Sequence, residues 1–278
     1  MRLIPRKLFR LFAASLAVWP ALALPQASAA AEDKATKGPL TLRAKPEPVA
    51  IDPPRTAVIV VDMQNDFGAQ GGLFDLLGID RSGIQKIVAP TATVLAAARR
   101  AGILVIYLKM AFKPDLSDAG PPDSPNRIGH LRAGAGRTVR APDGTESRVL
   151  IRDTWNSDIL AELRPGPDDI LIYKHRFSGF FETELDAVLK AHGIRCLVFT
   201  GCTTSVCVES TIRDAMFRDY ACVLLADCTS EPLGAGLARS NYDATLLIVE
   251  QRFGSVSDSA ELLRTLGTPE PGSSGKGH

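Results

Sequence analysis

Three side chains with complementary chemistry follow apolar, strand-like segments of this chain: a carboxylate, an ammonium and a thiol. Asp62 closes TAVIVVD, Lys174 closes DILIYK, and Cys207 lies in GCTTSVC. Taken singly, each has an ordinary structural interpretation, because aspartates cap turns, lysines are usually solvated and cysteines pack as small apolar residues. Asp66 is an alternative carboxylate in the same segment. Taken together, the three supply a nucleophile, a base and a charge stabiliser.

The position of Cys207 near a predicted helix start indicates that it is the nucleophile of the three. Unpaired backbone N–H groups and the helix dipole at such a start favour a thiolate over a thiol. Asp62 could take the thiol proton, and Lys174 could hold the thiolate that attacks an amide-like carbonyl. N–H groups of the turn could then hold the oxyanion. The residue types therefore predict acyl chemistry on a small molecule.

Alternating strands and helices must position these side chains. Short apolar, β-branched runs predict buried parallel strands at 56–62, 103–109, 169–174, 196–201, 222–227 and 245–250. Helical patterns lie between them at 89–102, with Pro90 near its start, at 181–193 and at 206–220. This alternation predicts an α/β fold: a doubly wound, mainly parallel six-stranded sheet with helices on both faces. Ligands bind beyond the carboxyl ends of such strands, where the three side chains converge.

A long connection, residues 111–153, interrupts the alternation and is rich in Gly, Pro and Asp. Connections of this length are usually functional. We expect it to form a lid or a wall of the substrate pocket.

The composition of the chain favours a small-molecule ligand over nucleic acid or anionic lipid. The chain has 278 residues, 45% of them hydrophobic, enough for one large α/β domain. Its 32 basic and 31 acidic residues give no net charge signal for nucleic acid or anionic lipid. The histidines are dispersed, and neither a dinucleotide fingerprint nor a P-loop is present, so we expect no metal and no cofactor. We expect a small-molecule substrate, no nucleic acid partner and a homo-oligomer.

Residues 1–30 have the pattern of a cleavable signal peptide. Cationic MRLIPRKLFR precedes apolar LFAASLAVWPALAL and the small residues of PQASAA, with cleavage expected near Ala29 or Ala30. An uncleaved anchor is the alternative, and RKLF weakly resembles a twin-arginine signal. The pattern predicts a periplasmic or secreted protein that is free of the membrane after cleavage. Residues 31–50 are expected as a flexible lead-in, 51–267 as the single folded domain and 268–278 as a disordered tail.

The cysteines do not have the pattern of a disulfide framework. Their number is odd, and most lie in or beside predicted core strands, where reduced cysteines pack as small apolar residues: Cys196, Cys202, Cys207, Cys222 and Cys228. We expect Cys202 to pack at a strand end. A redox pair of Cys202 and Cys207 is the alternative.

Three motifs, in order, carry a resemblance to a known family. They are D-x-Q-x-x-F in VDMQNDF, the lysine of YKHRFSGFF, and G-x-x-T-x-x-C-V in GCTTSVCV. The chain resembles the isochorismatase-like cysteine hydrolases over about residues 52–267. Within that family it looks most like ureidoacrylate amidohydrolases, and next like biuret hydrolases.

The resemblance implies a three-layer fold and roles for individual residues. Asp62 would be general base and acid, Lys174 the orienting cation and Cys207 the nucleophile. It also implies a cis peptide bond between Cys202 and Thr203, with the N–H groups of Thr203 and Cys207 forming an oxyanion hole. The implied reaction is hydrolysis of a C–N bond through a covalent thioester, without a cofactor.

The residues expected at the substrate are Gln64, Met110, Phe112 and Arg176. Where the resemblance implies an Asn and a Trp after the second strand, this chain has Met110 and Phe112, which predicts a more apolar pocket wall. We therefore expect a ureido or carboxamide compound with a modest apolar substituent. Gln64 and Arg176 could instead hold their loops. The alternative functions are a non-catalytic binding protein of the same fold and an isochorismatase- or nicotinamidase-type hydrolase.

Overall fold

The computed structural model describes residues 38–234, 236–238 and 240–268. The predicted signal peptide, the first part of the predicted lead-in and nearly all of the predicted tail lie outside the described residues. Export of the protein therefore stays a prediction from the sequence. Of the helices that are described, none has the length and apolar character needed to cross a membrane.

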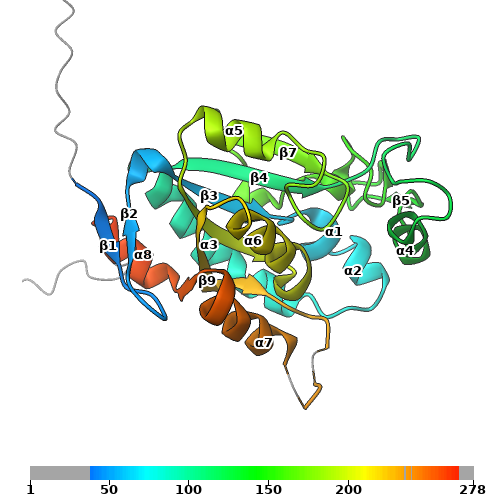
Figure 1. Cartoon of the computed structure of the whole chain (residues 1–278). Helices are drawn as coiled ribbons and strands as arrows, with labels where there is room; N and C mark the ends of the chain where they lie inside the picture. The colour runs from blue at the N-terminus through cyan, green and yellow to red at the C-terminus, as the bar shows by residue number, and fades with distance from the viewer. Residues whose placement is uncertain (1–37, 235, 239, 269–278) are drawn as a thin grey trace, which may run out of the picture. The chain divides into compact units, whose positions relative to one another are not determined.

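The central sheet has the architecture that the alternating pattern predicted. Within the described residues it consists of six strands, all parallel, in the order β10-β9-β8-β3-β4-β7 (Figure 1). The strands are β3 (Thr56–Val61), β4 (Leu104–Met110), β7 (Ile170–Lys174), β8 (Cys196–Cys202), β9 (Ala221–Ser230) and β10 (Ser255–Ser257). Every residue of β3, the most apolar and β-branched of these segments, is buried, as expected for a central parallel strand.

The strand order fixes the place of the site. From β3 the chain steps outwards through β4 to β7, and then returns to the other side of β3 with β8, followed by β9 and β10. The order therefore reverses between β3 and β8. Crevices for ligands form beyond the carboxyl ends of strands at such a reversal. The segments that begin at Asp62 and Cys202 leave the sheet there.

Helices cover both faces of the sheet (Figure 1). Val58 and Val60 of β3 belong to the same apolar cluster as α3, α8 and the excursion after β4, whereas Ile59 and Val61 pack in a second cluster with α5 and α6. The larger helices are α3 (Ser82–Arg100), α4 (Pro125–Ala133), α5 (Leu185–Ala191), α6 (Glu209–Met216), α7 (Asn241–Ile248) and α8 (Ser259–Thr265). This distribution confirms the doubly wound, three-layer prediction.

The strand predicted at 245–250 is wrong, because this segment is helical. It lies in α7 and in the helical turn Val249–Phe253, and the edge strand of the sheet is β10 instead. The Ser240 side chain caps α7 by accepting a hydrogen bond from the Asp243 N–H, which fixes a helix start just before the apolar run. A short apolar run does not by itself distinguish a buried strand from a helix.

The first long helix also begins earlier than predicted. Helix α3 starts at Ser82 rather than at residue 89, so Pro90 lies inside it. The prediction was wrong because proline is favoured in the first helical turn, and Pro90 was taken to mark that turn. Ile84 and Ile87 extend the buried stripe of α3 into the segment before the proline.

Residues 40–50 correct the expectation of a flexible lead-in. Strand β1 (Leu40–Leu42) pairs antiparallel with β2 (Val49–Ile51), and the side chains of Leu42 and Ile51 are fully buried. The Lys45 N–H donates to the Val256 carbonyl of β10 at 2.8 Å. Burying two large aliphatic side chains gives this hairpin a stable place on the domain.

The long connection after β4 has secondary structure of its own. It contains α4 and the antiparallel pair β5 (Thr138–Arg140) and β6 (Glu146–Arg148). Ser124 caps the start of α4, with Pro125 at the first helical position, and Gly134 ends it in the left-handed conformation with φ 109°. Residues of α4 line the cavity described below, so the expected pocket excursion is present.

Candidate active site

Asp62 leaves β3 in a conformation that aspartate adopts rarely. Its φ is 53°, in the left-handed region, while its N–H still donates to the Leu108 carbonyl of β4 at 3.0 Å. The turn brings the carboxylate back over the strand ends, where Oδ1 accepts a hydrogen bond from the Met110 N–H at 3.1 Å. Sparsely populated backbone conformations persist only where the surrounding structure enforces them, and they concentrate at functional sites.

Lys174, at the end of β7, forms a buried ion pair with this carboxylate. The Nζ atom lies 2.8 Å from Asp62 Oδ2, and the side chains are 0% and 1% exposed. The ammonium also donates to the Arg176 carbonyl at 3.3 Å. Burial raises the pKa of Asp62, and the neighbouring lysine opposes that rise. Burial alone would lower the pKa of Lys174, but the Asp62 carboxylate reverses this and raises it.

Cys207 lies in a π-helical turn, Thr204–Val208, which leads into α6; we call it the Cys207 turn. Its thiol is within hydrogen-bonding reach of both Asp62 and Lys174. Burial raises the pKa of Cys207, with Lys174 opposing the shift. The direction is opposite to the one expected from a helix start alone, because the group is withdrawn from water. The three side chains named by the sequence motifs therefore meet at one point.

The end of β8 carries the Cys207 turn to this position. The Cys202–Thr203 peptide bond is cis, as the resemblance implied. Gly201 has φ 112°, and a Cβ atom there would lie 2.0 Å from the Val61 carbonyl oxygen, so only glycine allows β8 to approach β3 this closely. The Thr203 carbonyl then accepts hydrogen bonds from the N–H groups of Val206 and Val208, each at 3.2 Å.

A second loop, SGFF after β7, is tied to the same turn. The Gly179 N–H donates to Thr211 Oγ1 at 3.0 Å, and this hydroxyl donates to the Cys207 carbonyl at 2.6 Å. The Ser178 hydroxyl donates to Asp214 of α6. These bonds join the loop that follows Lys174 to the helix that follows Cys207, and so fix the ammonium and the thiol relative to each other.

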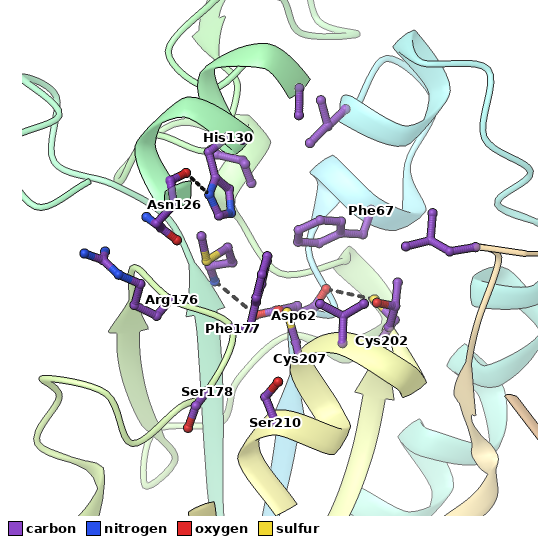
Figure 2. Close-up of a pocket in the computed structure, with 18 of the residues that line it drawn as sticks. Asp62, Phe67, Asn126, His130, Arg176, Phe177, Ser178, Cys202, Cys207 and Ser210 are labelled. Carbon is purple, nitrogen blue, oxygen red and sulfur yellow. Dashed lines mark hydrogen bonds between the residues drawn. The ribbon is translucent and has the colours of Figure 1, made fainter. Parts of the chain in front are cut away.

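The three side chains lie beside a cavity of about 1030 Å³, whose lining includes Asp62, Thr203 and Cys207 (Figure 2). Much of its wall is apolar and comes from several segments: Phe67, Leu73, Phe74, Leu77, Ile79, Met110, Leu150, Phe177, Phe181, Val206, Phe217 and Leu233. Concave apolar walls with a few placed polar groups are typical of small-molecule sites. The cavity has room for a substrate well beyond the size of a simple ureido acid.

The residues expected at the substrate fall into two groups. Met110 and Arg176 line the cavity. However, Arg176 Nη1 donates to the carbonyls of Asp118 at 3.1 Å and His175 at 2.7 Å, and its guanidinium points away from Cys207 (Figure 2). Gln64 and Phe112 are fully buried behind the wall instead.

Hydrogen bonding and packing explain these two corrections. The Gln64 amide exchanges hydrogen bonds with the backbone of Met110 and also donates to the Ser157 carbonyl, so it holds the loop. The Phe112 ring packs against the His130 ring, with 5.1 Å between the centroids. Sequence reasoning missed several cavity-lining residues, among them His130, whose position in a long connection gave no periodic signal.

Asp66, the alternative carboxylate, has a structural role. It accepts hydrogen bonds from the N–H groups of Leu73 and Leu150 and from the Asn156 amide, at 2.6 to 3.0 Å. Burial raises its pKa to about 6, although these donors oppose the shift. It therefore joins three segments that build the wall rather than facing the thiol.

Replacing Asp66 by alanine should destabilise the fold without changing the chemistry. At pH 7.5 the carboxylate is ionised, and its loss leaves buried donors unpaired, which costs about 3 kcal/mol or more. Urea unfolding measures this loss, and activity per folded molecule at 15 °C should stay within about threefold of wild type. Asp75→Ala, which removes a more exposed carboxylate bonded to Gly71 and Arg81, is the matched control and should cost less. An inactive but fully stable Asp66→Ala would contradict the structural assignment.

In the described part of the chain, no group of three or more His, Cys, Asp or Glu side chains is arranged to hold a metal ion. All five cysteines lie in the described residues and are free. The Cys202 thiol donates to the Asp62 carbonyl at 3.4 Å.

Comparisons with known proteins agree with this geometry. The isochorismatase domain model matches residues 56–261. Ureidoacrylate amidohydrolase RutB of Caulobacter segnis is 42% identical over 234 residues, which cover 84% of this chain and 95% of that protein. A cysteine hydrolase from Pseudomonas syringae pv. phaseolicola 1448A is similar in structure, with a TM-score of 0.66, 31% identity and coverage of 82% of this chain and 97% of that one. N-carbamoylsarcosine amidase from Thermoplasma acidophilum follows with a TM-score of 0.53, 25% identity and coverage of 74% and 96%. With the family model spanning most of the domain that carries Asp62, Lys174 and Cys207, this chain belongs to the isochorismatase family.

Proposed function

We propose that this protein is a cysteine-dependent amidohydrolase that cleaves a C–N bond of a ureido or carboxamide compound with a modest apolar substituent. The observation that carries the proposal is the contact of the Asp62–Lys174 ion pair with the Cys207 thiol beside a large apolar cavity. The names of its relatives, a ureidoacrylate amidohydrolase and an N-carbamoylsarcosine amidase, support the reaction class.

The first half of the reaction forms a covalent intermediate. Asp62 takes the proton of Cys207. Because burial raises the pKa of the thiol, the thiolate is unfavourable in the resting site, so the proton moves to Asp62 as the sulfur attacks the carbonyl carbon. Lys174 stabilises the negative charge while it lies on the Asp62 carboxylate and while it lies on the Cys207 sulfur. The N–H groups of Thr203 and Cys207 hold the oxyanion of the tetrahedral intermediate. Protonated Asp62 then gives its proton to the departing nitrogen, the C–N bond breaks, and a thioester remains on Cys207.

The second half restores the enzyme. A water molecule gives a proton to Asp62 and attacks the thioester carbon, and the resulting tetrahedral intermediate is held by the same N–H groups. The C–S bond breaks, and the proton returns from Asp62 to the Cys207 sulfur. One carboxylate therefore acts as base and acid in turn, which its buried position and raised pKa favour.

The wall of the cavity supports an apolar substituent. Phe67, Phe74 and Phe177 line it, and Met110 stands where the resemblance implied a polar residue. Burial of apolar surface contributes about 25 cal/mol per Å², so even a small alkyl or aryl group gains binding energy on this wall. A small anionic ureido acid would leave much of the wall uncovered.

A covalent adduct on Cys207 tests the proposed function. Single-turnover mass spectrometry with N-carbamoyl and carboxamide compounds that carry propyl, butyl or benzyl groups should show the mass of the acyl or carbamoyl group on the peptide that contains Cys207. Iodoacetamide pretreatment should abolish that mass. Cleavage of isochorismate at a comparable rate, with no adduct from any amide, would overturn the proposal.

A further inference from the structure

His130 projects into the cavity from α4 and belongs to none of the steps above (Figure 2). Its ring packs against Phe112, with 5.1 Å between the centroids, and against Phe177 at 5.4 Å. Two aromatic contacts at these distances restrict rotation of the imidazole. The histidine is therefore held in one orientation before a substrate enters.

The hydrogen bond of one ring nitrogen fixes the tautomer. Nδ1 of His130 lies 2.7 Å from the backbone carbonyl oxygen of Asn126, an atom that can only accept, so Nδ1 carries the hydrogen. The Asn126 side chain in turn donates to the carbonyls of Ala119 and His175, which anchors this part of α4 to the end of β7. Burial lowers the pKa of His130, so the ring is neutral and Nε2 keeps its lone pair.

The surroundings of Nε2 contain charges but no direct partner. Lys174, Arg176 and Asp62 are close enough to influence the pKa of His130. Among the residues that the structure describes, however, no donor forms a hydrogen bond with Nε2. An acceptor of fixed direction in a mostly apolar wall favours ligands that offer it a donor, because other ligands would leave it unpaired when water is displaced.

We propose that His130 determines specificity: its Nε2 accepts a hydrogen bond from an N–H group next to the reacting carbonyl of the substrate. Amides and ureas carry such a group. An ester places an oxygen lone pair at the same position, where it meets the lone pair of Nε2. Sites that are built to bond a substrate N–H discriminate strongly against analogues that lack it. This inference rests on the proposed amidohydrolase function and identifies the substrate N–H as the group that the site recognises.

The test compares His130→Phe with wild type on matched substrates: a secondary amide that wild type hydrolyses and the ester in which oxygen replaces its N–H. Phenylalanine preserves the aromatic packing and removes the acceptor. We expect kcat/KM to fall about 10- to 100-fold on the amide and not to fall on the ester, because the variant removes the lone pair that opposes the ester oxygen. For each substrate, the kcat/KM of the variant is divided by that of wild type, so the higher intrinsic reactivity of the ester cancels in the ratio.

Two further variants separate this role from a structural one. His130→Gln returns an acceptor of similar reach and should recover part of the loss on the amide only. His192 is the matched control, because its Nδ1 makes the same contact with a carbonyl four residues earlier, that of Val188, at the exposed C-terminal end of α5. His192→Phe should leave both substrates unaffected. An equal fall on amide and ester in His130→Phe, or no fall on either, would overturn the proposal.

A binding measurement distinguishes failure of this inference from failure of the proposed function. Calorimetric titration of the amide and the ester into Cys207→Ala reads affinity without turnover. If wild type forms no adduct, yet His130→Phe in that background weakens amide binding selectively, the reaction is wrong and the role of His130 stands. If Cys207→Ala and the double variant Cys207→Ala/His130→Phe bind the amide with equal affinity, the role of His130 is rejected while the proposed reaction stands.

Discussion

Turnover is expected to fall by about four orders of magnitude or more when Cys207 is replaced by alanine, because the change removes the thiol that lies against the Asp62–Lys174 ion pair. The fold should persist, since the side chain that is lost is small and the Cys207 turn is held by backbone bonds to Thr203. Activity on the best substrate of an amide and urea panel, with circular dichroism as the check of folding, measures this.

The matched control for that variant is Cys202→Ala. Cys202 also lines the cavity, but its thiol donates to the Asp62 carbonyl rather than facing the ion pair. It should keep at least about a third of the wild-type rate. Equal loss in both variants would instead support a redox pair, and more than a tenth of the wild-type rate in Cys207→Ala would remove the nucleophile assignment.

Lys174→Met should destabilise the protein strongly as well as inactivate it. The change leaves the Asp62 carboxylate buried without its partner 2.8 Å away, and uncompensated buried charges of this kind cost about 3–5 kcal/mol. Urea denaturation at pH 7.5 measures the loss in the free energy of unfolding. Methionine is chosen because it fills nearly the same volume as lysine.

The double variant Asp62→Asn/Lys174→Met separates stability from catalysis. It removes both charges, and the amide oxygen can still accept from the Met110 N–H, so it should regain about 2 kcal/mol or more of the lost stability. It should remain inactive, because neither a base nor a cation is left beside Cys207. A single Lys174→Met variant as stable as wild type would show that Asp62 is not ionised in the folded protein.

The sequence predicted the part of the site that depends on strand ends. Asp62, Lys174 and Cys207 each lie directly after a buried apolar run or its turn, and parallel strands bring such positions to one edge. The error at 245–250 arose because an apolar run this short is shared by strands and helices. In the structure the run is not fully buried, since Leu247 is 54% exposed on the surface of α7.

The side chains of the wall were harder to predict. Gln64 and Phe112 were expected at the substrate because they are near Asp62 and the end of β4 in sequence, but whether a side chain faces the cavity or the core depends on local turns that composition does not encode. His130 reaches the cavity through the path of the excursion, and its role depends on contacts with Phe112 and Asn126 that only the folded chain brings together.

The way α4 is attached has a consequence for the energy landscape of the protein. None of its nine residues, all of them described, is buried, whereas the residues of β3 are buried throughout. Local opening of this segment therefore exposes little apolar surface and costs far less free energy than global unfolding. We therefore expect the histidine-bearing helix to open more readily than the strands that hold the ion pair, a difference that hydrogen exchange of the α4 and β3 amides measures. Opening of α4 would widen the cavity for a bulky molecule, while the buried strands keep Asp62 and Lys174 in place.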